Sequence, residues 1–182
     1  MSNNLRKRFI AIASLALFAV SSAIAQEHKW AGRNLDDLEW TVHEKLAVLP
    51  FYGVFDTIRF ELNGNDVVLT GQVVKESVKH NAERSVKQIP GVHKVSNRIE
   101  VLPSSRRDDV LRQNVYRAIY EKAPLTKYSA REVPPVHILV KDGWVSLEGV
   151  VDSSADRSLV HLRALEVTAH VSDNLRVASS GS

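Results

Sequence analysis

Apolar and polar positions follow the same order twice along this chain. The run VVLTGQV at 67–73 returns as VSLEGVV at 145–151, 78 residues further on. Alternation with a period of two places every second side chain on one face, so each run predicts a β-strand with one buried face. A repeat at a fixed spacing predicts two small modules of one fold.

Each copy carries the same elements in the same order. A shorter apolar alternation precedes each run, at 58–62 and at 136–140, and turn residues (Asn63-Gly64, Asp142-Gly143) join the two as hairpins. Helical spacing of apolar residues predicts helices over 36–49, 75–89 and 153–166, and a further helix with its stripe from Leu111 to Ile119. Ser153 or Ser154 is the expected N-cap of the helix over 153–166. The hairpin strands of the second copy are predicted over 136–141 and 144–151, and the last strands over 95–101 and 171–177.

Amphipathic helices bury their apolar stripe on the apolar face of a sheet. The pattern therefore predicts an α+β fold with two tandem α-β-β-α-β modules, each a small three-stranded sheet packed by two helices. We place the modules at 35–103 and 107–178, on either side of a short Pro-Ser-Ser linker.

The first 25 residues predict a secretory signal. A basic start (Arg6-Lys7-Arg8) precedes an apolar run, and Ala23-Ile24-Ala25 is a small-x-small cleavage site. The apolar run is short for a membrane span, so we expect export and cleavage after Ala25, with a retained N-terminal anchor as the alternative. This predicts an exported protein.

Removal of this signal changes the charge argument. The whole chain has 24 Lys and Arg against 21 Asp and Glu, but three of the basic residues and none of the acidic ones lie in the signal. The remaining chain is balanced, so its charge gives no reason to expect nucleic-acid binding. With no cysteine, the two cores must be stabilised by packing without disulfides.

Two short motifs resemble one known family. V-x-L-x-G-x-V at 67–73, followed by P-G-V-x-x-V-x-N-x-I at 90–99, resembles the BON domain, and the resemblance extends as two copies over nearly all of the chain after the signal. It implies structural roles for Gly71, Gly91, Asn97 and Gly149. A glycine inside a strand also suggests the close approach of another backbone or a bulge, and we expect a larger residue at Gly71 or Gly149 to strain the packing of helices on the sheet. The second copy lacks the Gly-Val pair before its last strand, so we expect a differently capped helix end there.

The resemblance implies a non-catalytic protein of the bacterial envelope and, together with the signal, a periplasmic location. BON domains are thought to attach to phospholipid membranes or other envelope structures and to help maintain the envelope under stress. The residues agree: we find no nucleophile motif, no phosphate loop and no pair of histidines at metal-ligand spacing among the seven. We therefore predict no catalytic residue, no cofactor and no metal, and interpret the histidines as solvated surface residues.

One group of side chains is typical of an anionic lipid surface. Tyrosine rings lie at headgroup depth and Arg or Lys side chains meet phosphates. The candidates, all in the second module, are Arg112, Tyr116, Arg117, Tyr120, Lys122, Lys127 and Tyr128. The alternative is an ordinary solvated helix face.

Aromatic residues also gather in the first module. Trp40, Phe51, Tyr52 and Phe55 surround the end of its first helix, where they could close the core, join the modules or form a binding patch. We thus expect a protein that binds a phospholipid membrane surface or another envelope component. The alternative is a protein–protein adaptor or chaperone-like factor that uses exposed aromatics on a polypeptide partner.

Overall fold

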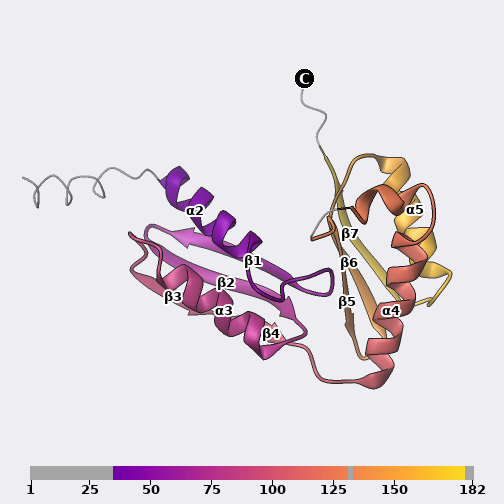
Figure 1. The fold of residues 1–182 in the computed structure, drawn as a ribbon, viewed down its shortest axis with the longest axis horizontal. Coiled ribbons are helices and arrows are strands. Elements are labelled where there is room, and N and C mark those ends of the chain that lie inside the picture. The colour runs from indigo at the N-terminus through magenta and orange to yellow at the C-terminus, as the bar shows by residue number, and fades with distance from the viewer. Residues whose placement is uncertain (1–34, 131–132, 179–182) are drawn as a thin grey trace, which may run out of the picture.

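Two α+β modules follow one another along the chain (Figure 1). The computed structural model describes residues 35–130 and 133–178. Module one contains α2 (Leu35–Ala47), β1 (Thr57–Asn63), β2 (Asp66–Val73), α3 (Glu76–Lys87), β3 (Lys94–Asn97) and β4 (Glu100–Val101). Module two contains α4 (Arg106–Tyr120), the short 3-10 helix η1 (Leu125–Tyr128), β5 (Val136–Lys141), β6 (Trp144–Val151), α5 (Ser154–Leu165) and β7 (Val171–Val177). The predicted fold class is confirmed; the signal lies outside the described residues.

Both sheets have the same topology. β1 pairs antiparallel with β2, and β3 and β4 pair parallel with the other side of β2. In module two, β5 pairs antiparallel with β6, and β7 pairs parallel with β6. The helices of each module cover one face of its sheet (Figure 1). β1 and β5 are therefore equivalent outer strands, and each sheet keeps a second face that no helix of its module covers.

The cores follow the predicted stripes. In module one, Val42, Val78 and Leu69 are completely buried among residues from both helices and the sheet. In module two, Val115, Leu147 and Val160 occupy the corresponding places. Since burial of one such side chain stabilises a fold by about 1.5–3 kcal/mol, these two clusters can hold the modules without disulfides.

The last strand of module one differs from its prediction. The sequence predicts one strand over 95–101, but the strand is split into β3 and β4 at Arg98 and Ile99. The Asn97 side chain lies at the break: its oxygen accepts from the Ile99 N–H, and its nitrogen donates to the Lys79 carbonyl oxygen (3.0 Å) and to Glu83. Asn97 thus ties the strand to α3, in agreement with a structural role.

Gly71 and Gly149 allow two strands to approach closely. Their φ angles are 121° and 117°, a region that favours glycine. A Cβ at Gly71 would overlap the carbonyl oxygen of Thr57, and one at Gly149 would overlap that of Pro135. The sequence predicts strain against the helices if a side chain is added here. The structure corrects the reason, since the obstacle is the backbone of the neighbouring strand.

The helix ends before the last strands also differ between the modules. Gly91 (φ 98°) turns the chain in module one, and its carbonyl oxygen accepts from the Asn65 side chain. In module two, the N–H groups of Glu166 and Thr168 donate to the carbonyl oxygens of Leu162 and Ala164. The predicted difference in capping is therefore present, and α5 closes without the glycine.

The two modules are in direct contact. Val54, in the loop before β1, accepts a hydrogen bond from the Ile138 N–H on β5 (2.8 Å), and Phe55 packs against the core of module two. Two ion pairs join the sheets, Arg59 to Glu148 at 2.8 Å and Lys141 to Glu100 at 2.6 Å. The loop before β1 is thus the main link between the modules.

Candidate functional site

Three of the seven lipid candidates are buried. Arg112, Tyr120 and Tyr128 are each 2% exposed. Their charged and hydroxyl groups predict a surface position, because such groups are usually solvated. Here each polar end has partners inside the protein, so a bilayer does not reach these side chains in the folded state.

Arg112 and Tyr120 attach α4 to the outer strand β5. Arg112 donates to the Val140 carbonyl oxygen (2.6 Å) and pairs with Asp109. The Tyr120 hydroxyl donates to the Val136 carbonyl oxygen and accepts from its N–H. Both side chains therefore satisfy backbone groups of β5 that would otherwise be buried without partners.

Lys127 and Tyr128 attach η1 to the start of α5. The Asp156 carboxylate accepts from Lys127 (2.8 Å), from the Tyr128 hydroxyl (2.9 Å) and from Ser153. Lys127 and the Ser153 hydroxyl, by these hydrogen bonds, hold the pKa of Asp156 below its usual range. Ser153 is the N-cap of α5, as predicted. The loop that the sequence assigns to lipid binding is thus fixed to its own module.

The other three candidates lie on or near the surface. Tyr116 is half-buried and its ring meets that of Phe55 edge to face, with centroids 6.2 Å apart. Arg117 is exposed and donates to Asn114 on the same helix. Lys122 pairs with Glu166 at 3.3 Å. The seven candidates therefore do not form one continuous surface.

The exposed aromatic tip is in module one. Phe51 is 70% exposed and Val48 is 77% exposed, directly after α2. The Tyr52 N–H donates to the Leu49 carbonyl oxygen (3.2 Å), which closes a turn with Phe51 as its third residue. Phe51 has a φ of 66°, a value that suits glycine and strains a bulky residue. We call Val48, Phe51 and the adjoining Lys75 the Phe51 tip.

The strain at Phe51 makes its ring a candidate functional group. A glycine at this turn position would fold better, because it takes left-handed angles without steric conflict. Departures from local rules are concentrated at functional sites. Lys75 lies 5.1 Å from the centroid of the Phe51 ring, so an apolar ring and a cation are presented together. Trp40 is exposed on the neighbouring face of α2.

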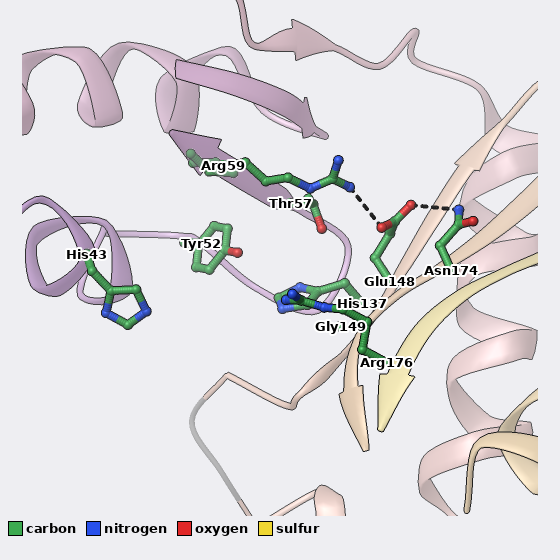
Figure 2. A pocket seen from close by; sticks show the side chains of 10 residues that line it. His43, Tyr52, Thr57, Arg59, His137, Glu148, Gly149, Asn174 and Arg176 are labelled. Carbon is green, nitrogen blue, oxygen red and sulfur yellow. Dashed lines mark hydrogen bonds and ion pairs between the residues drawn. The ribbon is translucent and has the colours of Figure 1, made fainter. Parts of the chain in front are cut away.

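The other two aromatic residues of module one point inward, toward the junction. Tyr52 lies against His137 of β5, with ring centroids 5.8 Å apart, and Phe55 meets Tyr116. Next to them is a cleft of about 780 Å³, with walls from α2, β1 and the uncovered face of the second sheet (Figure 2). The sequence leaves open whether these aromatics close the core, join the modules or bind. Tyr52 and Phe55 join the modules, whereas Trp40 and Phe51 remain exposed.

Basic side chains outnumber acidic ones in the lining of this cleft. Arg59, Arg176, His43 and His137 line it, with Glu148 as its acid (Figure 2). Glu148 is already satisfied, because it accepts from Arg59, Ser146 and Asn174. Arg176 is exposed on β7, so the cleft favours an anionic group.

Burial perturbs two titrating groups at the junction. It lowers the pKa of His137, against the opposing effect of backbone carbonyl oxygens and of the Asp56 and Glu148 charges. It raises the pKa of Asp56, although the N–H groups of Val74 and Gly53 donate to that carboxylate. The prediction that the histidines are solvated is thus wrong for His137, whose Nδ1 is buried without a hydrogen-bond partner.

Metal binding has no support in the described residues. Across 35–130 and 133–178, no three His, Cys, Asp or Glu side chains are grouped so that they could hold a metal ion. In the same part of the chain, no helix combines the length and apolar character needed to cross a membrane.

Comparison with known proteins identifies the family. The model of the BON domain matches residues 57–103 and 107–179, about two thirds of the chain, so the chain belongs to the BON domain family. BON domains are generally non-catalytic and are often tied to phospholipid binding in the cell envelope. The comparison with curated proteins gives no significant match.

Two similar solved structures are both of CdsD, a structural protein of the type III secretion system of Chlamydia trachomatis. The first, a C-terminal domain, has 13% sequence identity and a TM-score of 0.30 over 78% of this chain and 64% of that chain. The second has 14% identity and a TM-score of 0.29 over 80% of this chain and 95% of that chain. This chain therefore spans less than two thirds of the first CdsD structure.

Proposed function

We propose that this protein is a non-catalytic periplasmic envelope protein that binds phospholipid membrane surfaces and supports envelope integrity. The main observation behind this proposal is the Phe51 tip. It joins a strained, exposed aromatic ring to the exposed Val48 and the cation of Lys75. Rings inserted at headgroup depth and a cation at the phosphates are the two contributions that bind a protein to an anionic membrane.

Three observations support this proposal. Membership of the BON family brings an association with envelope phospholipids. The N-terminal pattern of basic, apolar and small residues predicts export to the compartment where those membranes are reached. In module two, three of the residues predicted to bind lipid are buried, which leaves the tip of module one as the better candidate.

Phe51→Gly is a sharp test of the tip. The variant removes the ring and relieves the left-handed strain, so its melting temperature should be equal to or above that of the wild type. Its binding to vesicles of phosphatidylcholine and phosphatidylglycerol should fall about tenfold or more, because burial of an aromatic side chain is worth about 1.5–3 kcal/mol. Co-sedimentation measures the binding.

Two further variants provide comparisons for Phe51→Gly. Trp144→Ala removes a similarly exposed aromatic from module two (57% exposed) and should leave binding unchanged. Lys75→Gln should weaken binding by about 1 kcal/mol at low salt and less at high salt. Unchanged binding by Phe51→Gly, or loss only when Arg117 and Lys122 are replaced by Gln, would move the site back to module two.

A further inference from the structure

In module two, a segment of module one covers the outer edge of the sheet. Val54 lies along β5 and accepts from the Ile138 N–H at 2.8 Å. Phe55 fills the space between β5 and α4, where it meets Tyr116. Residues 53–56 form a turn, closed by the Asp56 N–H and the Gly53 carbonyl oxygen (3.1 Å). The turn covers the edge of β5 through one main-chain hydrogen bond, and its aromatic side chain enters a groove between the first helix and the outer strand.

Module one has the same edge at β1. The paired positions Ile58↔Gly71 and Val136↔Gly149 align the two outer strands, so Phe60 corresponds to Ile138. Alternate N–H groups of an outer strand point away from the sheet. The Phe60 N–H therefore points outward, as that of Ile138 does. Within the described residues, no strand pairs with this side of β1.

Module one also has the groove. A hollow lies between α2 and β1, lined by His43, Leu46, Ala47, Tyr52, Ile58 and Phe60. His43 follows the completely buried Val42, just as Tyr116 follows the completely buried Val115. His43 is thus at the position where Tyr116 meets Phe55 in the other module. The groove that residues 53–55 fill in module two is open to solvent in module one.

The ends of this groove carry charge. It continues into the cleft of Figure 2, where Arg59 and Arg176 lie on facing walls. Since Glu148 is satisfied by Arg59, Ser146 and Asn174, it leaves the Arg176 guanidinium to an incoming anion. A peptide bound at the edge of β1 can therefore bring a carboxylate to Arg176 with little repulsion from Glu148.

We propose that the outer edge of β1 binds a short segment of a partner polypeptide through the same kind of main-chain contact. A backbone carbonyl of the segment accepts from the Phe60 N–H, an aromatic or branched apolar side chain enters the groove at His43, and a nearby carboxylate meets Arg176. Main-chain hydrogen bonds give affinity in this mode of recognition, and the groove and the arginines select the sequence.

This polypeptide site is separate from the Phe51 tip. Val48, Phe51 and Lys75 do not line the groove or the cleft. Lipid binding and peptide binding can therefore fail independently, and vesicle co-sedimentation of the same variants tells them apart.

The segment that fills the groove in module two supplies a probe. It is a fluorescein-labelled, capped peptide with the sequence of residues 52–58 (YGVFDTI), which holds an aromatic side chain followed by a carboxylate. Fluorescence anisotropy with the full chain should show saturable binding. Hydrogen exchange should show new protection of the Phe60 amide, and a peptide with asparagine in place of its aspartate should bind several-fold more weakly.

Two variants and two matched controls test the site. Ala47→Trp fills the groove from an exposed position, and Arg176→Glu reverses the charge; each should weaken peptide binding about tenfold or more. Ser77→Trp on α3 and Arg98→Glu between β3 and β4 make the same changes at exposed positions elsewhere and should stay within twofold of the wild type. Circular dichroism checks folding, and vesicle binding should be unchanged in all four.

Three results would overturn the proposal. The first is the absence of saturable peptide binding by the wild type. The second is binding that Ala47→Trp and Arg176→Glu both leave intact. The third is protection that appears at the Ile138 amide of module two and not at Phe60, since the peptide would then replace residues 53–55 and not occupy module one.

Discussion

At the scale of single residues, backbone conformation explains the role of key positions better than side-chain character does. Gly71 and Gly149 are required because another strand passes where a Cβ would be. Phe51 adopts a left-handed conformation that its own side chain disfavours. Glycine where nothing else fits indicates structure, and a bulky residue where glycine would fit better indicates function.

Comparison of Gly71→Ala with Gly64→Ala separates the steric overlap of an added Cβ from the strain of a positive φ. It should lower the free energy of unfolding by about 3 kcal/mol, because a left-handed alanine is strained and its Cβ overlaps the Thr57 carbonyl oxygen. Gly64→Ala shares a positive φ (61°) with open space around it and should lose about 1 kcal/mol. Urea denaturation measures both. Equal losses would mean that β1 moves away to accommodate the methyl group.

At the scale of elements, polar side chains join several helices to a sheet strand or to another helix. Arg112 and Tyr120 join α4 to β5, Asn97 joins β3 to α3, and Asp156 joins η1 to α5. Asp108 accepts from the N–H groups of Asp142 and Gly143 and so fixes the turn of the second hairpin. Asp108 lies in the first turn of α4, where an acidic residue is favoured by the helix dipole, and local sequence does not predict this longer-range contact.

Single glutamine variants on α4 and directly after it distinguish a buried anchoring arginine from exposed surface charges. Arg112→Gln should destabilise the protein by about 1–3 kcal/mol, because it removes a buried charged donor from the Val140 carbonyl oxygen. Arg117→Gln and Lys122→Gln, at exposed positions, should each change the unfolding free energy by less than about 0.5 kcal/mol. Thermal melts of the three variants provide the measurement. Similar stability of all three would mean that the Arg112 bond contributes nothing net.

At the scale of the whole molecule, the loop before β1 couples the modules. Its Val54 and Phe55 complete the outer edge of module two, and its Asp56 lies near His137. A tandem repeat does not require such a contact. The two modules therefore act as one unit at the junction, while the corresponding edge of module one remains open.

This coupling should weaken in acid. Burial lowers the pKa of His137, so below about pH 6.5, the usual histidine value, the unfolded chain takes up a proton that the folded protein does not. Stability is therefore lost as the pH falls through this range. Asp56 has the opposite sign, because its raised pKa favours protonation in the folded state at lower pH. A matched variant is needed to isolate His137.

The variant is His137→Gln. The difference in melting temperature between wild type and His137→Gln should shrink as the pH falls from 7.5 to 5.5, since only in the wild type does the buried ring oppose protonation. A difference that stays constant over this range would show that His137 keeps its charge state or is solvated when protonated.

The sequence by itself determined the repeat, the family, the fold class and most of the elements. Periodicity is a local property, so β5, β6 and β7 have the predicted bounds, and Ser153 caps α5 as expected. Local patterns also indicated close strand approach at Gly71, since a glycine inside a strand usually marks a bulge or a neighbouring backbone at short distance.

Only the tertiary structure decided which polar and aromatic side chains are exposed. Arg112, Tyr120 and Tyr128 look like surface residues in sequence, yet each finds a buried backbone or carboxylate partner on another element. Phe55 fills a groove of module two, whereas Phe51, four residues earlier, remains in solvent. Hydrogen-bond partners and burial depend on chain segments that are distant in sequence, and no local pattern contains them.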